Sequence, residues 1–322
     1  MMQPNGQPRP IAVGNEAQLY QALENGAVRI DLRDEIVVSQ SLHITGSVTL
    51  DGRRYPIRRG PGFTGVLLVV EPGGSLTLQS VTVDGHRARS APGEPLLLVD
   101  GGVAQLGCGA VLQNNHTLGP GGAVLVRTGP GRSSEFRMLA DSMIRNCRSE
   151  AAGGAVAAVF ADSVARGFVR VAGSCRICDN KAMSGGGLAA WHGPAGQGLV
   201  LIEGSCRIEN NFAALYGGGV SYENTGGAAA KPVTLRIGGT ACLESNRAVS
   251  GGGGGVCLRA ATVADRVIVG ERAQICDNAA RQGGGVCVYG VGDSGFLHSG
   301  GTVDRNRAEE AGQDVYIPAN KP

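Results

Sequence analysis

Residues 177–188 are Ile-Cys-Asp-Asn-Lys-Ala-Met-Ser-Gly-Gly-Gly-Leu, a run that suits a strand, a turn and a second strand. The same pattern, an aliphatic residue three before an asparagine and then three glycines, returns over residues 208–220, 243–256 and 275–286. Degenerate copies flank these on both sides. Repeats at roughly 30-residue intervals indicate a solenoid, a propeller or an array, in which each unit buries its apolar face against its neighbours.

Short strands rather than helices fill the repeats. β-branched and aliphatic residues form runs such as 124–126, 199–202 and 267–269, and no long helical periodicity separates them. Leucine-rich repeats and WD propellers are excluded because their signature residues are missing. The sequence therefore predicts an all-β fold, a right-handed, single-chain parallel β-helix whose coils stack about 4.8 Å apart.

Two columns of residues mark the corners of such a coil. An asparagine recurs in each repeat, where its side-chain amide can bond along the axis and its backbone tolerates the left-handed conformation of a sharp corner. The glycine triplets permit positive φ and close backbone approach at a second corner. Both columns are predicted to be structural. The asparagine column consists of Asn180, Asn211, Asn246, Asn278 and Asn306.

Two resemblances to known families follow from these motifs. Gly-Gly-[Ala/Leu/Val] paired with [Ile/Leu/Val]-x-x-Asn over about residues 108–316 resembles the repeats of chlamydial polymorphic outer membrane proteins, which are autotransporter adhesins. The opening, on residues 17–23, 28–32, 48–52 and 76–85, is similar to pectate-lyase-like adhesive domains of bacterial surface proteins. The resemblances imply a parallel β-helix in an extracellular or cell-surface setting, and they imply no reaction.

Charge and hydropathy exclude several classes of partner. The 322 residues carry 29 basic and 27 acidic side chains, a formal charge of +2 without a basic cluster, so no nucleic-acid partner is predicted. No run of about 18 apolar residues occurs, so no membrane span is predicted. Residues 1–10 are polar and proline-rich, unlike the apolar core of a signal peptide, so the export route and a cytoplasmic location both stay open.

One elongated domain is predicted, in three parts. Residues 1–14 form a leader, residues 15–27 a capping helix, and residues 28–322 the β-helix, whose regular array covers about 108–316. Asn15 and Gln18 fit a capping box at the start of the helix, and Gly26 fits its stop. Such a helix would cover the open end of the solenoid and block pairing by other strands.

Nine cysteines are an odd number for a disulfide framework, and several recur at equivalent places in the repeat. Cys175 and Cys206 are expected to stack in the core, and Cys257 and Cys287 to lie on adjacent coils. We interpret them as free thiols that act as small apolar side chains. Because paired C-x-x-C motifs and histidine partners are missing, no metal site is predicted.

The strand after each glycine run supplies candidate ligand-binding residues. Its fourth position gives a column expected to face solvent. That column contains the only tryptophan, Trp191, beside charged and tyrosine side chains, and flat aromatic rings next to polar groups suit sugar rings. The alternative is that Trp191 covers the neighbouring loop at 193–198. With His192 added as the neighbour of Trp191, the predicted ligand-binding residues are Arg127, Trp191, His192, Glu223, Arg259 and Tyr289.

Acidic residues near the asparagine column do not by themselves indicate an enzyme. A lyase needs acids that hold calcium beside a base, and a glycosidase needs two carboxyl groups about 5 to 10 Å apart. The acids here interleave with basic residues, and we interpret them as a charge-balanced, solvated edge: Asp179, Glu209, Glu244, Asp277 and Asp304. No catalytic residue and no cofactor are predicted, apart from calcium if the chain is a lyase.

The sequence predicts a non-catalytic, adhesin-like binding or structural module of a bacterial surface or secreted protein. Its expected partner is a glycan, another extended polymer, or a host or cell-surface protein. Two alternatives stay open: a carbohydrate-active enzyme, either polysaccharide lyase or glycosidase, and a structural component of an envelope, phage or injection apparatus. Variable loops at 129–134, 193–198 and 224–232 are expected on one side of the coil, where binding specificity is commonly placed.

Overall fold

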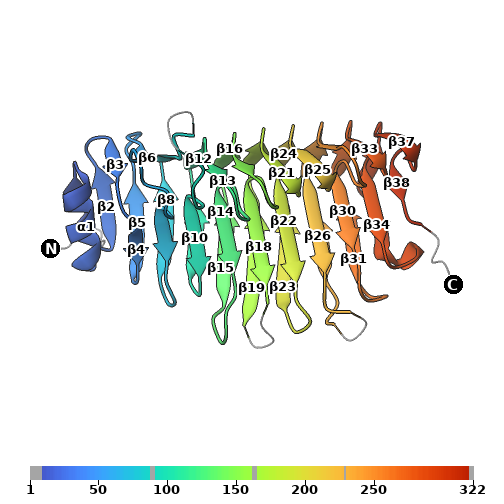
Figure 1. Ribbon diagram of the computed structural model, residues 1–322, viewed down its shortest axis with the longest axis horizontal. Coiled ribbons are helices and arrows are strands. Elements are labelled where there is room, and N and C mark those ends of the chain that lie inside the picture. Colours follow the sequence, from blue (N-terminus) through green and yellow to red (C-terminus); the bar gives the residue numbers. More distant parts are fainter. Residues whose placement is uncertain (1–8, 88–90, 162–164, 228–229, 319–322) are drawn as a thin grey trace.

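The protein is a parallel β-solenoid, as the repeats predicted. The computed structural model describes residues 9–87, 91–161, 165–227 and 230–318. Successive coils stack along one long axis, and each coil passes through up to four sheets, which we number 1 to 4 in chain order (Figure 1). The winding is consistent with a right-handed β-helix. None of the described residues forms a helix long and apolar enough to cross a membrane.

The four sheets contain all the named strands. Sheet 1 has 11 strands, β1 (Ile11–Val13), β2 (Arg29–Leu32), β5 (Ser47–Asp51), β8 (Ser75–Gln79), β11 (Val103–Leu106), β15 (Ser134–Met138), β19 (Arg166–Val171), β23 (Gln197–Ile202), β27 (Thr234–Ile237), β31 (Arg266–Gly270) and β35 (Phe296–Ser299). Sheet 2 has 10 strands, β3 (Ile36–Val38), β6 (Ile57–Arg59), β9 (Thr82–Asp84), β12 (Val111–Gln113), β16 (Met143–Arg145), β20 (Arg176–Cys178), β24 (Arg207–Glu209), β28 (Cys242–Glu244), β32 (Gln274–Cys276) and β36 (Thr302–Asp304). Sheet 3 has 7 strands, β13 (His116–Thr117), β17 (Arg148–Ser149), β21 (Lys181–Ser184), β25 (Phe212–Tyr216), β29 (Arg247–Ala248), β33 (Ala279–Gln282) and β37 (Arg307–Ala311). Sheet 4 has 10 strands, β4 (Leu42–Ile44), β7 (Leu68–Val70), β10 (Leu97–Asp100), β14 (Val124–Arg127), β18 (Val156–Phe160), β22 (Leu188–His192), β26 (Val220–Asn224), β30 (Val256–Arg259), β34 (Val286–Tyr289) and β38 (Val315–Tyr316).

The core is a set of aliphatic columns inside the coil. Because side chains alternate along a strand, every second residue points inward, and in-register pairing places equivalent residues one above another. The first position of the sheet 4 strands illustrates this, since all of its members from β14 to β34 are fully buried: Val124, Val156, Leu188, Val220, Val256 and Val286. Small aliphatic side chains in layers therefore make up most of the core, with few aromatic rings among them.

The asparagine column forms a continuous hydrogen-bonded ladder at the corner between sheets 2 and 3. The backbone N–H and Nδ2 of Asn180 both donate to Oδ1 of Asn211, at 3.1 and 3.0 Å. The same pair of bonds joins each later asparagine to the next one, and the side chains are between 0% and 5% exposed. Asp314 ends the ladder by accepting both bonds from Asn306 at 3.0 and 2.9 Å. The predicted structural role is confirmed.

The conformational reason given for asparagine was wrong, however. The residue in the left-handed region is the one before each ladder asparagine, with φ between 55° and 59°: Asp179, Asn210, Ser245, Asp277 and Arg305. Those five positions tolerate several residue types, whereas the ladder position demands a side chain that donates and accepts along the axis. Asparagine is therefore selected for its amide group.

The glycine triplets provide the second corner, as predicted. Gly217 has a φ of +61°, and a Cβ there would collide with the carbonyl oxygen of Val220. The equivalent first glycines of the neighbouring triplets also have positive φ. Only glycine meets both demands, because an L side chain is strained in this region and needs space that the backbone already occupies.

A short helix, α1 (Glu16–Glu24), lies at the N-terminal end of the solenoid (Figure 1). Asn15 is its N-cap and accepts from the backbone N–H of Gln18 at 2.9 Å, while Gln18 Oε1 accepts from Gly14 N–H at 2.8 Å. The helix buries Leu19 and Ala22 against the first coil. The predicted capping helix is confirmed. Residues 11–13, which we placed in the leader, instead form the edge strand β1 of sheet 1.

All nine cysteines are free thiols, and eight of them are buried. Cys175 and Cys206 stack in the core of adjacent coils, both 0% exposed, and Cys257 pairs directly with Cys287 on sheet 4. They pack as small apolar side chains, which agrees with the interpretation from their spacing.

Candidate functional site

The column of residues from which the ligand-binding candidates were taken lies on the outer face of sheet 4. In-register pairing aligns Asp100, Arg127, Val159, Trp191, Glu223, Arg259 and Tyr289 on seven successive strands. We call this set the Trp191 column. Arg127 and Arg259 are exposed, and Val159, Trp191, Glu223 and Tyr289 are half-buried. Trp191 is therefore reachable from solvent, at the centre of a line of side chains that runs parallel to the solenoid axis.

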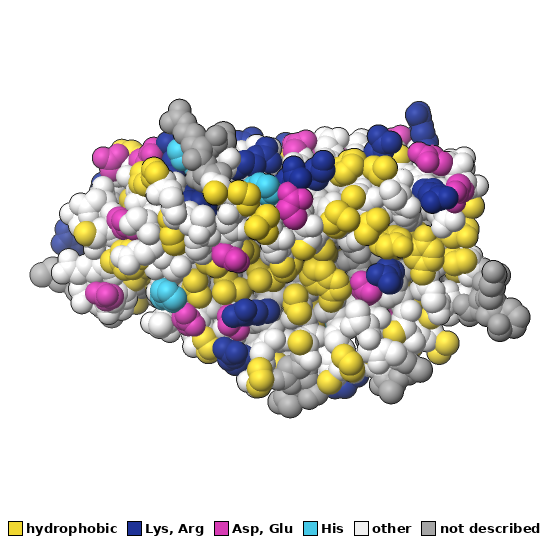
Figure 2. All heavy atoms as spheres, viewed as in Figure 1, with side chains coloured by type: hydrophobic (Ala, Val, Ile, Leu, Met, Phe, Trp, Pro, Cys, Tyr) yellow, Lys and Arg dark blue, Asp and Glu magenta, His cyan; other side chains and the backbone are white. Residues whose placement is uncertain are grey.

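The charged members of the Trp191 column pair with one another. Arg127 contacts Asp100 at 2.7 Å and Arg259 contacts Glu223 at 2.9 Å. Val159 and Trp191 lie between these two ion pairs. Seen from outside, the column is an apolar centre with a paired acid and base on each side. Figure 2 shows this face, with a band of apolar side chains across the middle and charged groups along its borders.

His192 does not belong to this surface, which corrects its place among the predicted residues. Alternation along β22 turns its side chain inward, and it is 2% exposed. Its ring lies edge-on to Phe160 and Tyr222, with centroids 4.9 and 5.3 Å away, and its Nε2 is 2.8 Å from the Tyr222 hydroxyl. Burial lowers the pKa of His192 to about 4, so the ring is neutral near pH 7.

Two glycines of sheet 1 make room for this internal aromatic cluster. Gly167 and Gly198 are directly paired on β19 and β23, and a Cβ on either would overlap the ring of Phe160. Phe160 is 0% exposed and fills the gap they leave. His192, the sequence neighbour of Trp191, is therefore part of the core together with Phe160 and Tyr222.

A polar pocket of about 380 Å³ opens at the C-terminal end of the Trp191 column. Its lining residues come from sheets 3 and 4 and from the turn between them: Tyr216, Ser250, Gly251, Arg259, Arg281, Gln282, Tyr289 and Glu310. We call it the tyrosine pocket. Tyr216 and Tyr289 meet edge-on at 5.9 Å, and the Arg259 guanidinium lies 5.3 Å from the Tyr216 ring centroid. Aromatic rings, two arginines and a carboxylate thus converge on one hollow.

Most residues of the tyrosine pocket were not predicted from the sequence. Arg259 and Tyr289 were predicted, but Tyr216 lies at the end of β25, where the pairing with β21 shifts register after Ala182. The shift brings this strand end next to the Trp191 column. Comparing the residue just before each glycine triplet would have pointed to Tyr216 and Gln282.

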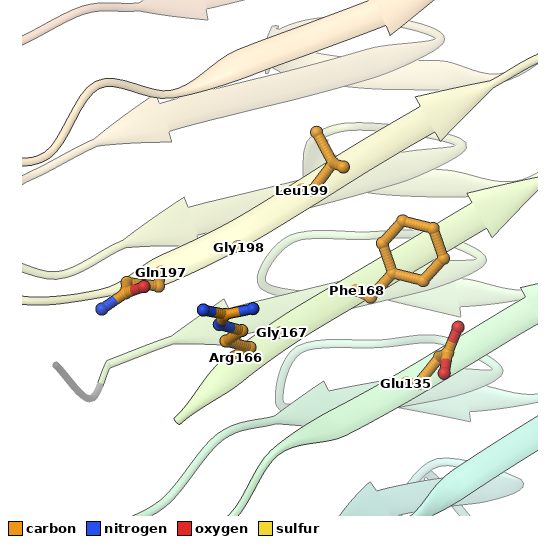
Figure 3. Close-up of a pocket in the computed structure, with 7 residues that line it drawn as sticks. All are labelled: Glu135, Arg166, Gly167, Phe168, Gln197, Gly198 and Leu199. Carbon is orange, nitrogen blue, oxygen red and sulfur yellow. The ribbon is translucent and has the colours of Figure 1, made fainter. Parts of the chain in front are cut away.

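A second hollow, of about 410 Å³, lies on the outer face of sheet 1 (Figure 3). Phe168 and Leu199 are paired neighbours on β19 and β23 and project to the same side, and Glu135 follows on β15. Arg166 and Gln197 lie at the beginnings of the two strands, next to the connections from sheet 4. This surface was not among those predicted from the sequence.

The loops predicted to share one side of the coil do so. The connections from β14 to β15 and from β22 to β23 leave the same edge, where sheet 4 passes into sheet 1, and β26 ends and β27 begins at that edge too (Figure 1). Residues 228–229 of the third predicted loop lie outside the described residues. Trp191 and Phe168 therefore flank this loop edge on two different faces.

Four of the five acids near the asparagine ladder are held in ion pairs, which supports their interpretation as a charge-balanced edge. Glu209 contacts both Arg176 and Arg207, and Arg207 also reaches Glu244. Further along, Arg305 binds Asp277 at 3.1 Å and Asp304 at 3.3 Å.

Comparisons with protein-family models, curated proteins and solved structures gave no match to this chain. The two resemblances described from the sequence remain expectations.

Proposed function

We propose that the protein is a non-catalytic, adhesin-like binding module that holds a glycan or another extended polymer along sheet 4. The carrying observation is Trp191, the only tryptophan, half-buried on a straight lateral column that leads into the tyrosine pocket. Aromatic faces bordered by hydrogen-bonding groups suit the apolar faces and hydroxyl edges of sugar rings. An extended ligand fits because the column repeats along the axis.

The spacing of the two carboxylates within the Trp191 column favours binding over hydrolysis along this column. The acids of the Trp191 column are Asp100 and Glu223, on strands separated by four coil steps, so they lie roughly 19 Å apart at about 4.8 Å per step. A glycosidase needs its two carboxyl groups within about 10 Å. Each acid is moreover paired with an arginine, at 2.7 Å in Arg127–Asp100 and 2.9 Å in Arg259–Glu223.

The proposed setting is a bacterial surface or a secreted protein, in line with the resemblance of the repeats to adhesins. In this setting the solenoid is a rigid rod that presents its lateral face, and the loop edge beside Trp191 adjusts specificity.

The test is a glycan and polysaccharide array on the purified chain, run with and without calcium and scored for retention and for released product. Trp191→Ala should lose retention. Phe168→Ala is the matched control, because it removes a half-buried aromatic ring from the other hollow; it should bind like wild type.

Each outcome has a definite meaning. Release of product from any retained polysaccharide would contradict the non-catalytic role and favour a lyase or glycosidase, especially if it needed calcium. Loss of retention in Phe168→Ala but not in Trp191→Ala would move the binding surface to sheet 1. No retention of any glycan by wild type would contradict the proposal and favour a structural part.

A further inference from the structure

The outer face of sheet 2 carries a second group of chemically reactive side chains, away from the Trp191 column. Cys242 and Glu244 point outward from β28, and Cys276 from the next strand, β32. The two Sγ atoms and a carboxylate oxygen all lie within 4.8 Å of one another. The Cys242 thiol donates to Glu244 Oε2 across 3.6 Å. Two thiols and a carboxylate therefore converge on one point.

We propose that Cys242, Cys276 and Glu244 bind a thiophilic divalent cation of the Zn²⁺ class. Thiolate sulfur selects zinc and similar soft or borderline ions, and a carboxylate oxygen is a common additional zinc ligand. Water would complete a tetrahedral site. The site was not predicted from the sequence, because its ligands come from adjacent coils and do not form a C-x-x-C pattern. This inference is independent of the proposed glycan binding.

The pairing register favours a bridging ion over a disulfide. Cys276 pairs with Glu244, and Cys242 pairs with Gln274, so the two cysteines are diagonal neighbours. One coil step and two residues along the strand put their Cα atoms roughly 8 Å apart. A disulfide requires less than about 7 Å between Cα atoms. Two metal–sulfur bonds of about 2.3 Å each can span sulfurs up to about 4.6 Å apart.

The carboxylate can serve the ion without giving up its present partner. Arg207 contacts Oε1 of Glu244, whereas Oε2 is the oxygen that faces Cys242. Arg207 would therefore hold Glu244 in place and balance part of the negative charge of the occupied site, as an outer partner of a metal ligand does. Glu244 is 24% exposed in its side chain, which gives an ion access from solvent.

Binding of the metal ion must release protons from the thiols, and this proton release can be measured. Each thiol exchanges its proton for a bond to the metal, so one divalent ion displaces two protons and leaves every atom accounted for. Besides Glu244, the charged groups facing the thiols are Glu209 and Arg207 from β24, Asp304 from β36, and Asp277 and Arg305 from the adjoining turns. Affinity should rise with pH.

The experiment uses the full chain, reduced, with Cd²⁺ and Zn²⁺ as probes. We expect one Cd²⁺ per chain, with the ultraviolet absorption of cadmium–thiolate bonds, and displacement of Cd²⁺ by Zn²⁺. Two protons per ion should appear in a weakly buffered titration. Cys242→Ser and Cys276→Ser should each abolish the absorption, and Glu244→Gln should weaken binding by at least about 10-fold. Cys175→Ser, at a buried cysteine stacked on Cys206, is the matched control and should bind like wild type.

Alkylation of native wild type covers the case in which a serine variant does not fold. Bound Zn²⁺ should protect Cys242 and Cys276 from a small thiol reagent and leave the exposed Cys108 reactive, as mapped by mass spectrometry. Three results would each overturn the site. The cadmium absorption could be absent in wild type, or it could persist in folded Cys242→Ser or Cys276→Ser. Alternatively, bound Zn²⁺ could leave Cys242 and Cys276 as reactive toward the thiol reagent as they are without the ion.

Discussion

Removing the side-chain amide of one ladder asparagine should lower the stability of the fold far more than the small size of the side chain implies. The Asn211 side chain takes part in four hydrogen bonds: its Nδ2 donates to Ile177 O at 2.9 Å and Asn246 Oδ1 at 3.0 Å, and its Oδ1 accepts two bonds from Asn180 at 3.1 and 3.0 Å. At about 1 kcal/mol each, Asn211→Ala should lower the free energy of unfolding by about 4 kcal/mol. For a chain of this length, that lowers Tm by about 6 °C.

The neighbouring residue provides the control for this prediction. Asn210 is exposed and has a φ of 55°, a conformation that glycine adopts without strain. Asn210→Gly should stay within about 1 kcal/mol of wild type. Thermal melts by circular dichroism and denaturant unfolding would measure both variants. If Asn211→Ala is as stable as Asn210→Gly, the ladder does not stabilise the corner and the reasoning fails.

Two further predictions concern the internal aromatic cluster. Gly198→Ala should destabilise the chain by about 2 kcal/mol, because the new methyl group overlaps Phe160, and the cost should shrink in a Phe160→Leu background; equal costs in both backgrounds would refute the overlap. His192 has a pKa of about 4 in the folded chain and about 6.5 in the unfolded chain. The neutral ring therefore contributes fully to the stability of the fold above about pH 6.5. As the pH falls toward 4, the unfolded state takes up a proton that the folded state refuses, and stability should drop by about 3 kcal/mol. Tm measured against pH should fall less steeply in His192→Gln, and parallel profiles would contradict a buried neutral ring.

The architecture was predictable because the same strand-and-turn pattern recurs along the sequence, and each copy indicates the same coil. Once the glycine triplets were aligned, pairing in register followed, and the Trp191 column appeared on the strands where alternation placed it. The structural role of the asparagines was equally clear, since only stacking along the axis explains one amide per coil. Their conformational role was misjudged, because the sequence does not show which corner residue has positive φ.

Contacts between different columns were not predictable from the repeat. Tyr216 approaches Tyr289 through a register shift in sheet 3, and Cys242 meets Cys276 on a diagonal. His192 was assigned by its proximity to Trp191 in the chain, although adjacent residues of a strand face opposite ways. Irregular pairing and diagonal neighbours depend on backbone geometry that a period of roughly 30 residues does not encode.

Fluorescence of Trp191 tests the central claim most directly, because the chain contains no other tryptophan. A glycan retained by the array would be titrated into wild type and into Phe168→Ala while the emission is followed. The account predicts a saturable change in intensity or wavelength in both proteins, with the same Kd as retention. Retention at full strength with unchanged Trp191 emission would contradict binding along the column.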